Sequence, residues 1–238
     1  MSGLRVEGLS FSYGDKQALD GVGFTVDPGS FCALLGPNGA GKSTLFALLT
    51  RLLTARDGLI EIAGHRLDKS PRAALARLGI VFQQSTLDLD LTVRQNLKYF
   101  AALHGIAGRD AARRIDAALE RLDMAPRADE RARTLNGGHR RRTEIARALL
   151  HDPKVLLLDE ATVGLDAAAR ASITGHVHAL CDEGISVLWA THLTDEVRSA
   201  DRLVMLHRAR VIADGTAGDI AGDVPLQQRF LDMTGQAA

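Results

Sequence analysis

The 238-residue sequence has few of the residues that mark several common classes of protein. Aromatic residues make up 4% of the chain, and there are two cysteines, Cys32 and Cys181. Two cysteines without framework spacing argue against a disulfide-stapled fold and predict reduced thiols in a cytoplasmic protein. The 29 basic residues are balanced by 29 acidic residues, so the electrostatic footprint of a nucleic-acid-binding protein is absent. No apolar run approaches the ~20 residues that span a bilayer, so a membrane role would require a membrane partner.

Hydrophobic residues make up 46% of the chain, which is enough for a full core. The length predicts one large domain or a domain with a lobe. Short apolar runs bounded by turn residues predict strands at 6–13, 22–26, 31–35, 59–62, 79–82, 155–158, 186–190, 203–206 and 210–213, the last two as a hairpin. Apolar residues at helical spacing predict helices at 45–53, 72–78, 94–103, 109–122, 140–150, 167–181, near 195–199 and at 226–233. Between residues 87 and 150 the strand signals disappear and Ala, Leu and Arg dominate. We therefore predict an α/β fold with an inserted helical lobe.

A glycine-rich stretch between an apolar strand and a helix is the most specific signal. It fits the pattern G-x-x-x-x-G-K-[ST] of a phosphate-binding loop and consists of Gly36, Pro37, Asn38, Gly39, Ala40, Gly41, Lys42, Ser43 and Thr44. Glycines let the backbone approach a phosphate, and the N–H groups of the turn and the helix start point at the anion. Lys42 can reach the β- and γ-phosphates, and the Ser43 hydroxyl can bind Mg²⁺. The alternative is a glycine-rich turn followed by an unrelated lysine.

A second signal is the strand 155–158, whose continuous apolar run is typical of a sheet covered on both faces. It ends in Asp159 and Glu160, at the edge of a parallel sheet where ligands bind. Asp159 can bind Mg²⁺ directly or through water, and Glu160 can accept a proton from an attacking water. The alternative is an acidic pair that faces solvent at the end of a strand.

The order of these motifs, with Leu135-Asn136-Gly137-Gly138-His139 between them, resembles the ATP-binding subunits of ATP-binding cassette (ABC) transporters. The segment 135–139 is similar to the family signature Leu-Ser-Gly-Gly-Gln. The resemblance to the family runs from Leu4 to about Gly215. It implies a P-loop NTPase core with a mostly parallel sheet and an N-terminal antiparallel β subdomain, formed by residues 1–86 and 151–238. The inserted helical subdomain would be residues 87–150.

The resemblance also implies roles for single residues. Tyr13 would stack on adenine, and Gln83 would contact Mg²⁺ and the attacking water and couple to the membrane partner. Asn136, Gly137 and Gly138 would meet the γ-phosphate held by a second copy in a head-to-tail homodimer. Asp166 lies in the loop that would cross the dimer interface, and His192 would contact the γ-phosphate. The implied catalytic set is thus Glu160, His192, Gln83 and Lys42, and the implied Mg²⁺ ligands are Ser43, Gln83 and Asp159.

Two substitutions depart from the family signature, because Asn136 replaces the usual Ser and His139 replaces the usual Gln. Asparagine can still donate a hydrogen bond to phosphate, so we expect activity to survive with altered kinetics. Residues 86–97 and the tail 230–235 resemble the ATPases of two-component exporters that act with a separate membrane permease. The signature is also similar to exporter subunits associated with quinone-dependent alcohol oxidation. The implied location is the cytoplasmic side of the membrane, as a peripheral subunit.

Other members of the P-loop class fit the sequence less well. A chromosome-maintenance ATPase needs sustained heptads between the phosphate loop and the signature, and none is present. A translation-factor relative needs two cassettes, whereas there is one phosphate loop. A nucleoside kinase would not need the segment 135–142. A regulatory ATPase of the ABC type without a transport role stays open as the alternative.

Overall fold

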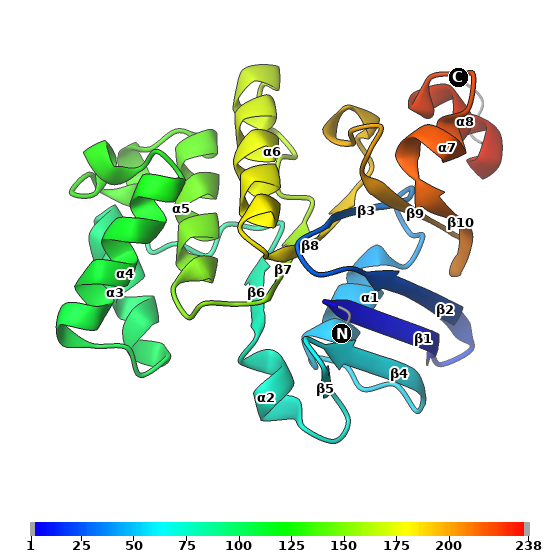
Figure 1. The fold of residues 1–238 in the computed structure, drawn as a ribbon, viewed down its shortest axis with the longest axis horizontal. Helices are drawn as coiled ribbons and strands as arrows, with labels where there is room; N and C mark the ends of the chain where they lie inside the picture. The colour runs from blue at the N-terminus through cyan, green and yellow to red at the C-terminus, as the bar shows by residue number, and fades with distance from the viewer. Residues whose placement is uncertain (1–2, 236–238) are drawn as a thin grey trace.

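The computed structural model describes residues 3–235 and contains two β-sheets with helices around them (Figure 1). The larger sheet has six strands in the order β10-β9-β3-β8-β7-β6. In chain order these are β3 (Phe31–Leu35), β6 (Leu78–Val81), β7 (Val155–Asp159), β8 (Ser186–Thr191), β9 (Arg202–His207) and β10 (Arg210–Thr216). All pairs are parallel except β9 with β10, which form the predicted antiparallel hairpin.

The smaller sheet is antiparallel and has four strands in the order β2-β1-β4-β5. Its strands are β1 (Leu4–Tyr13), β2 (Lys16–Val26), β4 (Asp57–Ile62) and β5 (His65–Arg66). Together the two sheets confirm the predicted α/β fold with an N-terminal antiparallel sheet and a mostly parallel core. The ends of the predicted core, residues 1–2 and 236–238, lie outside the described residues.

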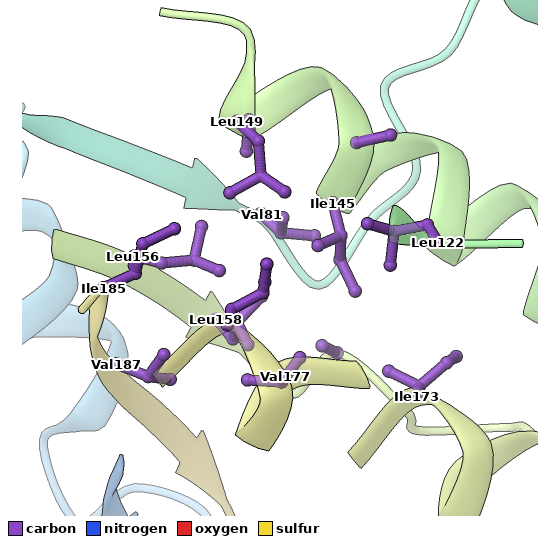
Figure 2. Close-up of a cluster of buried hydrophobic side chains, with 14 of the residues drawn as sticks. Val81, Leu122, Ile145, Leu149, Leu156, Leu158, Ile173, Val177, Ile185 and Val187 are labelled. Atoms are coloured by element: carbon purple, nitrogen blue, oxygen red, sulfur yellow. The ribbon is translucent and has the colours of Figure 1, made fainter. Parts of the chain in front are cut away.

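The central strands β3, β7 and β8 of the larger sheet are buried on both faces, and their alternate residues belong to two separate cores. Leu156 and Leu158 of β7 point into the core under α5 and α6, where Figure 2 shows them with Ile145 and Val177. Leu157 points to the opposite face, into the core that contains α1 and the antiparallel sheet. This period-two division explains why the strand sequence is apolar at every position.

Helices cover both cores. Helix α1 (Lys42–Leu49) packs its apolar side chains between the two sheets. Helices α3 (Val93–Leu103), α4 (Gly108–Arg121) and α5 (Gly137–Leu149) gather to one side of the molecule, next to α6 (Ala167–Asp182), as Figure 1 shows. The shorter elements are α2 (Pro71–Leu75), α7 (Ala217–Ala221), α8 (Leu226–Thr234) and the 3₁₀ turns η1 (Ala125–Arg127), η2 (Ala132–Thr134) and η3 (Thr194–Glu196).

The prediction of a helix near 195–199 is wrong. The chain forms only the 3₁₀ turn η3, and Val197 returns to an extended conformation with φ −107° and ψ 122°. The turn is fixed because the Glu196 side chain is buried and bonded to Thr162 and Thr191, which pulls the segment onto the core. The helix predicted at 72–78 ends at Leu75, since Leu78 already pairs with Val155 in the sheet. Within residues 3–235, no helix is long and apolar enough to cross a membrane.

Candidate active site

The phosphate-loop candidate forms a tight turn between β3 and α1, and its glycines are required by the geometry. A Cβ on Gly36 would lie 2.4 Å from the carbonyl oxygen of Leu206, and one on Gly41 would lie 2.5 Å from that of Ala18. Gly41 also has a φ of 118°, which L side chains rarely adopt. Lys42 is buried and folds back over the turn, where its Nζ donates to the carbonyl of Gly36 at 2.6 Å.

Four side chains from four different loops converge at one edge of the larger sheet. Glu160 follows β7, and Gln83 Nε2 donates to its Oε2 at 3.2 Å. Lys42 Nζ and His192 Nδ1 each lie 3.4 Å from Glu160 Oε1. The loops after β3, β6, β7 and β8 supply these groups, because the carboxyl ends of parallel strands meet at the same edge. The predicted catalytic set is therefore assembled within one chain.

Burial and mutual charge shift the pKa values in this cluster. Burial lowers the pKa of Lys42, and the negative charge of Glu160 opposes that shift. Burial raises the pKa of Asp159, and the neighbouring Glu160 carboxylate raises it further. Two carboxyl groups in a partly buried place, with one ammonium between them, form a site that an additional cation would stabilise.

The remaining nucleotide-contact candidates belong to the turn before α1, to the start of α1 and to β1. Asn38, Gly39 and Ser43 are exposed at the turn and the helix start. Tyr13 is 52% exposed on the antiparallel sheet, and its ring packs against Phe11 in a T-shaped arrangement with the ring centroids 5.0 Å apart. Pro37, Ala40 and Thr44 complete the turn and the first turn of α1.

The signature candidate lies at the start of α5, and Asn136 is its N-cap. The Asn136 Oδ1 accepts from the backbone N–H of His139 at 2.8 Å, so α5 begins three residues earlier than the predicted 140. Asn136 and Gly137 are exposed, while Gly138 is buried. A Cβ on Gly137 would lie 2.8 Å from Leu165, which places the signature against the loop that ends in Asp166.

Asp166 is the N-cap of α6, where its Oδ1 accepts from the Ala169 N–H at 2.8 Å. No hydrogen bond or ion pair among residues 3–235 joins the signature to the cluster around Glu160.

Sequence reasoning missed a buried network that holds the segment after β6. Arg141 of α5 donates to the carbonyls of Phe82 and Gln83 at 2.6 and 2.7 Å. Glu144, 1% exposed, accepts from Arg141 at 2.9 Å and from the Thr86 N–H at 2.8 Å. Arg147 donates to the Thr86 hydroxyl at 2.6 Å. The sequence signal that could have indicated this network is the i, i+3 spacing of Arg141, Glu144 and Arg147 on one helix.

Comparison with known proteins gives a consistent picture. An ABC transporter family model matches residues 19–163. The daunorubicin resistance ATP-binding protein DrrA3 of Streptomyces coeruleorubidus is 41% identical over 92% of this chain and 70% of its own length. Nod factor export ATP-binding protein I of Paraburkholderia xenovorans (strain LB400) is 39% identical over 90% of this chain and 72% of its own length. Neither relative gives support to the predicted link with quinone-dependent alcohol oxidation.

Solved structures agree with these relatives. An ATP-binding subunit of an ABC transporter superposes with a TM-score of 0.84 at 29% identity and covers 97% of this chain and 99% of its own. The structure of cbiO1 from Clostridium perfringens, part of the ABC transporter complex cbiONQ, also gives 0.84, at 31% identity over 92% of this chain and 90% of its own. The family match covers more than half of the chain, and the loop 36–44, the end of β7 and the signature all lie within the matched residues. The chain belongs to the ABC transporter family, as an ATP-binding subunit that hydrolyses ATP.

Proposed function

We propose that two copies of this chain close head to tail on two ATP molecules, and that hydrolysis drives export through a separate membrane permease. One copy would hold each ATP with the loop 36–44 and Tyr13. The second copy would contribute Asn136, Gly137, Gly138 and the loop that ends in Asp166. Two observations support this arrangement: Asn136 and Gly137 are exposed, and within residues 3–235 no hydrogen bond or ion pair joins residues 135–139 to the Glu160 cluster.

The observation that carries the proposal is the convergence of Lys42, Gln83 and His192 on the Glu160 carboxylate. Glu160 would orient a water and accept its proton as the water oxygen attacks the γ-phosphorus and ADP leaves. Lys42 and His192 would stabilise the negative charge on the transferred phosphoryl group. Lys42 would exchange its contact with the Gly36 carbonyl for contacts with phosphate oxygens.

Ser43, Gln83 and Asp159 are the proposed ligands of Mg²⁺. The fit is supported by the raised pKa of Asp159, since a nearby cation would offset the cost of burying that charge. Hydroxyl, amide and carboxylate oxygens are the hard donors that Mg²⁺ prefers. When bound, the ion would neutralise charge on the β- and γ-phosphates.

The test of the hydrolytic site is Glu160→Gln. The variant should keep ATP binding and accumulate an ATP-bound dimer, while turnover falls by ~100-fold or more, the scale of a lost general base. Sedimentation with Mg²⁺ and ATP measures the dimer, and phosphate release measures turnover. Glu120→Gln, a change on the exposed face of α4, serves as the control and should behave like the wild type. Unchanged turnover in Glu160→Gln would remove Glu160 from its proposed role.

The permease would dock at a groove next to Gln83. This groove has a volume of about 280 Å³ and is lined mainly by apolar side chains, namely Leu52, Leu75, Leu78, Ile80, Phe82, Phe100 and Ala148 with His104 and His151. Leu52 of this groove is 70% exposed, and Leu103, which precedes the lining residue His104, is 65% exposed. We propose that residues 87–150 act as a helical subdomain whose movement links this groove to the ATP site, with the chain peripheral on the cytoplasmic face.

Export rather than import is supported by the names of the relatives, which describe drug resistance and Nod factor export. Purification of the chain from membranes should bring down an integral membrane protein, and Leu52→Glu with Leu103→Glu should weaken that association. Recovery of the chain with no integral partner would favour the regulatory ATPase alternative.

A further inference from the structure

A buried carboxyl group lies behind the Glu160 cluster and belongs to no motif of the sequence. Glu196 of η3 is 2% exposed. The hydroxyl of Thr162 donates to its Oε1, and the hydroxyl of Thr191 donates to its Oε2. Thr191 in turn accepts from the Leu193 N–H at 2.9 Å, which leaves its own hydroxyl proton directed at Glu196.

The two threonines stand on the two loops that supply the candidate site. Thr162 is two residues after Glu160, in the segment that ends at Asp166. Thr191 immediately precedes His192, at the end of β8. A single carboxyl group therefore joins the loop of the proposed base to the strand end of the proposed γ-phosphate contact.

Helix α6 supplies further contacts between the same two segments. Arg170 donates to the carboxylate of Asp195 at 2.5 Å and to the carbonyl of Leu165 at 3.4 Å. Glu196 thus joins the two loops through Thr162 and Thr191, and Arg170 joins them again through Leu165 and Asp195.

We propose that Glu196 is a positioning residue for ATP hydrolysis, an inference that rests on the proposed function of Glu160 and His192. Through Thr162 and Thr191, Glu196 fixes the loop from Glu160 to Asp166 relative to His192. In this role Glu196 would act through these two hydroxyls and not through contact with the nucleotide. Small displacements of positioned groups reduce rates strongly, by as much as ~100-fold for about 1 Å.

The charge of this group changes near neutral pH. Burial is the main cause that raises the pKa of Glu196, the carboxylate of Asp195 adds to it, and the balance of all causes places this pKa at about 7. The Thr191 hydroxyl, the Arg170 guanidinium and the Trp189 indole N–H lower it. These are the charged and polar groups that face the carboxyl from β8, α6 and η3. Trp189 is the single tryptophan of the sequence, so its fluorescence reports on this group without interference.

The experiment compares Glu196→Ala with Glu196→Gln in the full chain. The alanine variant leaves both hydroxyls without a partner, so kcat should fall ~10-fold or more while KM for ATP changes less than about threefold. The glutamine variant can accept from Thr191 and donate to Thr162, so kcat should return to within about threefold of the wild type. Wild-type Trp189 emission should change between pH 6 and 8, and that change should be absent in Glu196→Gln.

Glu120→Ala on α4 is the matched control and should alter neither kcat nor emission. If Glu196→Ala does not fold, Thr162→Val removes one of the two bonds with nearly the same shape, and its kcat should fall while KM stays. Wild-type kcat in Glu196→Ala or in Thr162→Val, or emission that is flat across pH 6–8 in the wild type, would overturn the proposal. If Glu160→Gln also keeps its turnover, the proposed function fails as well; if Glu160→Gln loses turnover, only the role of Glu196 fails.

Discussion

At the scale of single residues, Glu160 occupies a backbone conformation that its side chain does not favour. Its φ is +47°, in the left-handed region, and its N–H donates to the Ala190 carbonyl at 2.9 Å. This turn ends β7 abruptly and aims the carboxylate at Lys42, Gln83 and His192. A non-glycine residue in this region carries a cost of about 1–3 kcal/mol, which the surrounding hydrogen bonds must offset.

That strain gives a prediction in which stability and activity separate. Glu160→Gly should be more stable than Glu160→Ala by about 1 kcal/mol, because glycine adopts positive φ without strain. Both variants lack the carboxylate and should lose turnover. Urea unfolding measures the difference. The control pair, Asp116→Gly and Asp116→Ala on the exposed face of α4, should give the opposite sign, since alanine is favoured by about 1 kcal/mol in a helix. An alanine variant at 160 that equals the glycine variant would show that no strain is stored there.

At the scale of elements, α5 connects the signature to the segment that contains Gln83. Its N-terminus presents Asn136 and Gly137, and its buried charges hold the segment that contains Gln83. Burial lowers the pKa values of Arg141 and Arg147, and the Glu144 carboxylate opposes both shifts. A displacement of α5 would therefore be transmitted to the backbone of Gln83.

Removal of the central carboxylate should be costly. Glu144→Ala leaves Arg141 and Arg147 buried without their counter-charge and should lower the free energy of unfolding by about 3 kcal/mol. The comparison is Glu130→Ala, which removes the partner of Arg127 in an ion pair that is more exposed than the Glu144 network. This variant should change the free energy of unfolding by less than about 1 kcal/mol. Chemical denaturation of both variants tests this, and equal effects would show that the network on α5 contributes no more than a surface pair.

At the scale of the whole molecule, the nucleotide is expected to bind at an open edge of the larger sheet rather than in an enclosed cavity. The groups that would hold it from one chain stand on four loops, and the signature stands apart from them. Net charge is zero, so electrostatic repulsion between copies does not oppose their approach. In the proposed dimer, the binding energy of ATP would therefore be shared between nucleotide contacts and contact between copies.

This sharing predicts how ATP changes thermal stability. ATP at 100 times its Kd should stabilise the chain by about 2.7 kcal/mol, which corresponds to a rise in Tm of about 5–10 °C for a protein of this size. Differential scanning fluorimetry with Mg²⁺ and ATP measures the rise. In Glu160→Gln the rise should also increase with protein concentration, because the dimer is retained. Lys42→Ala should abolish it, and an equal rise in that variant would show that ATP does not bind through Lys42.

Local motifs in the sequence determined the family, the α/β class and the side chains of the candidate site. The pattern around Lys42, the apolar strand before Asp159 and the glycines after Asn136 are signals carried by adjacent residues, because phosphate binding requires backbone geometry that few residues allow. The larger elements, such as α6 and the β9–β10 hairpin, followed from the periodicity of apolar residues, which is also a local property of the sequence. The proposed division at residues 87 and 150 and the roles of single site residues stay predictions.

Only the tertiary structure decided how residues distant in the chain meet. The distances from Glu160 to Lys42 and Gln83 depend on the strand order of the parallel sheet, which no local pattern encodes. Glu144 and Glu196 appear in the sequence as ordinary charged residues of a helix, and the predicted helix near 195–199 failed because Glu196 turns inward. Burial and hydrogen bonding of a single carboxyl group are properties of its surroundings in the fold, and those surroundings come from segments about 30 to 60 residues away.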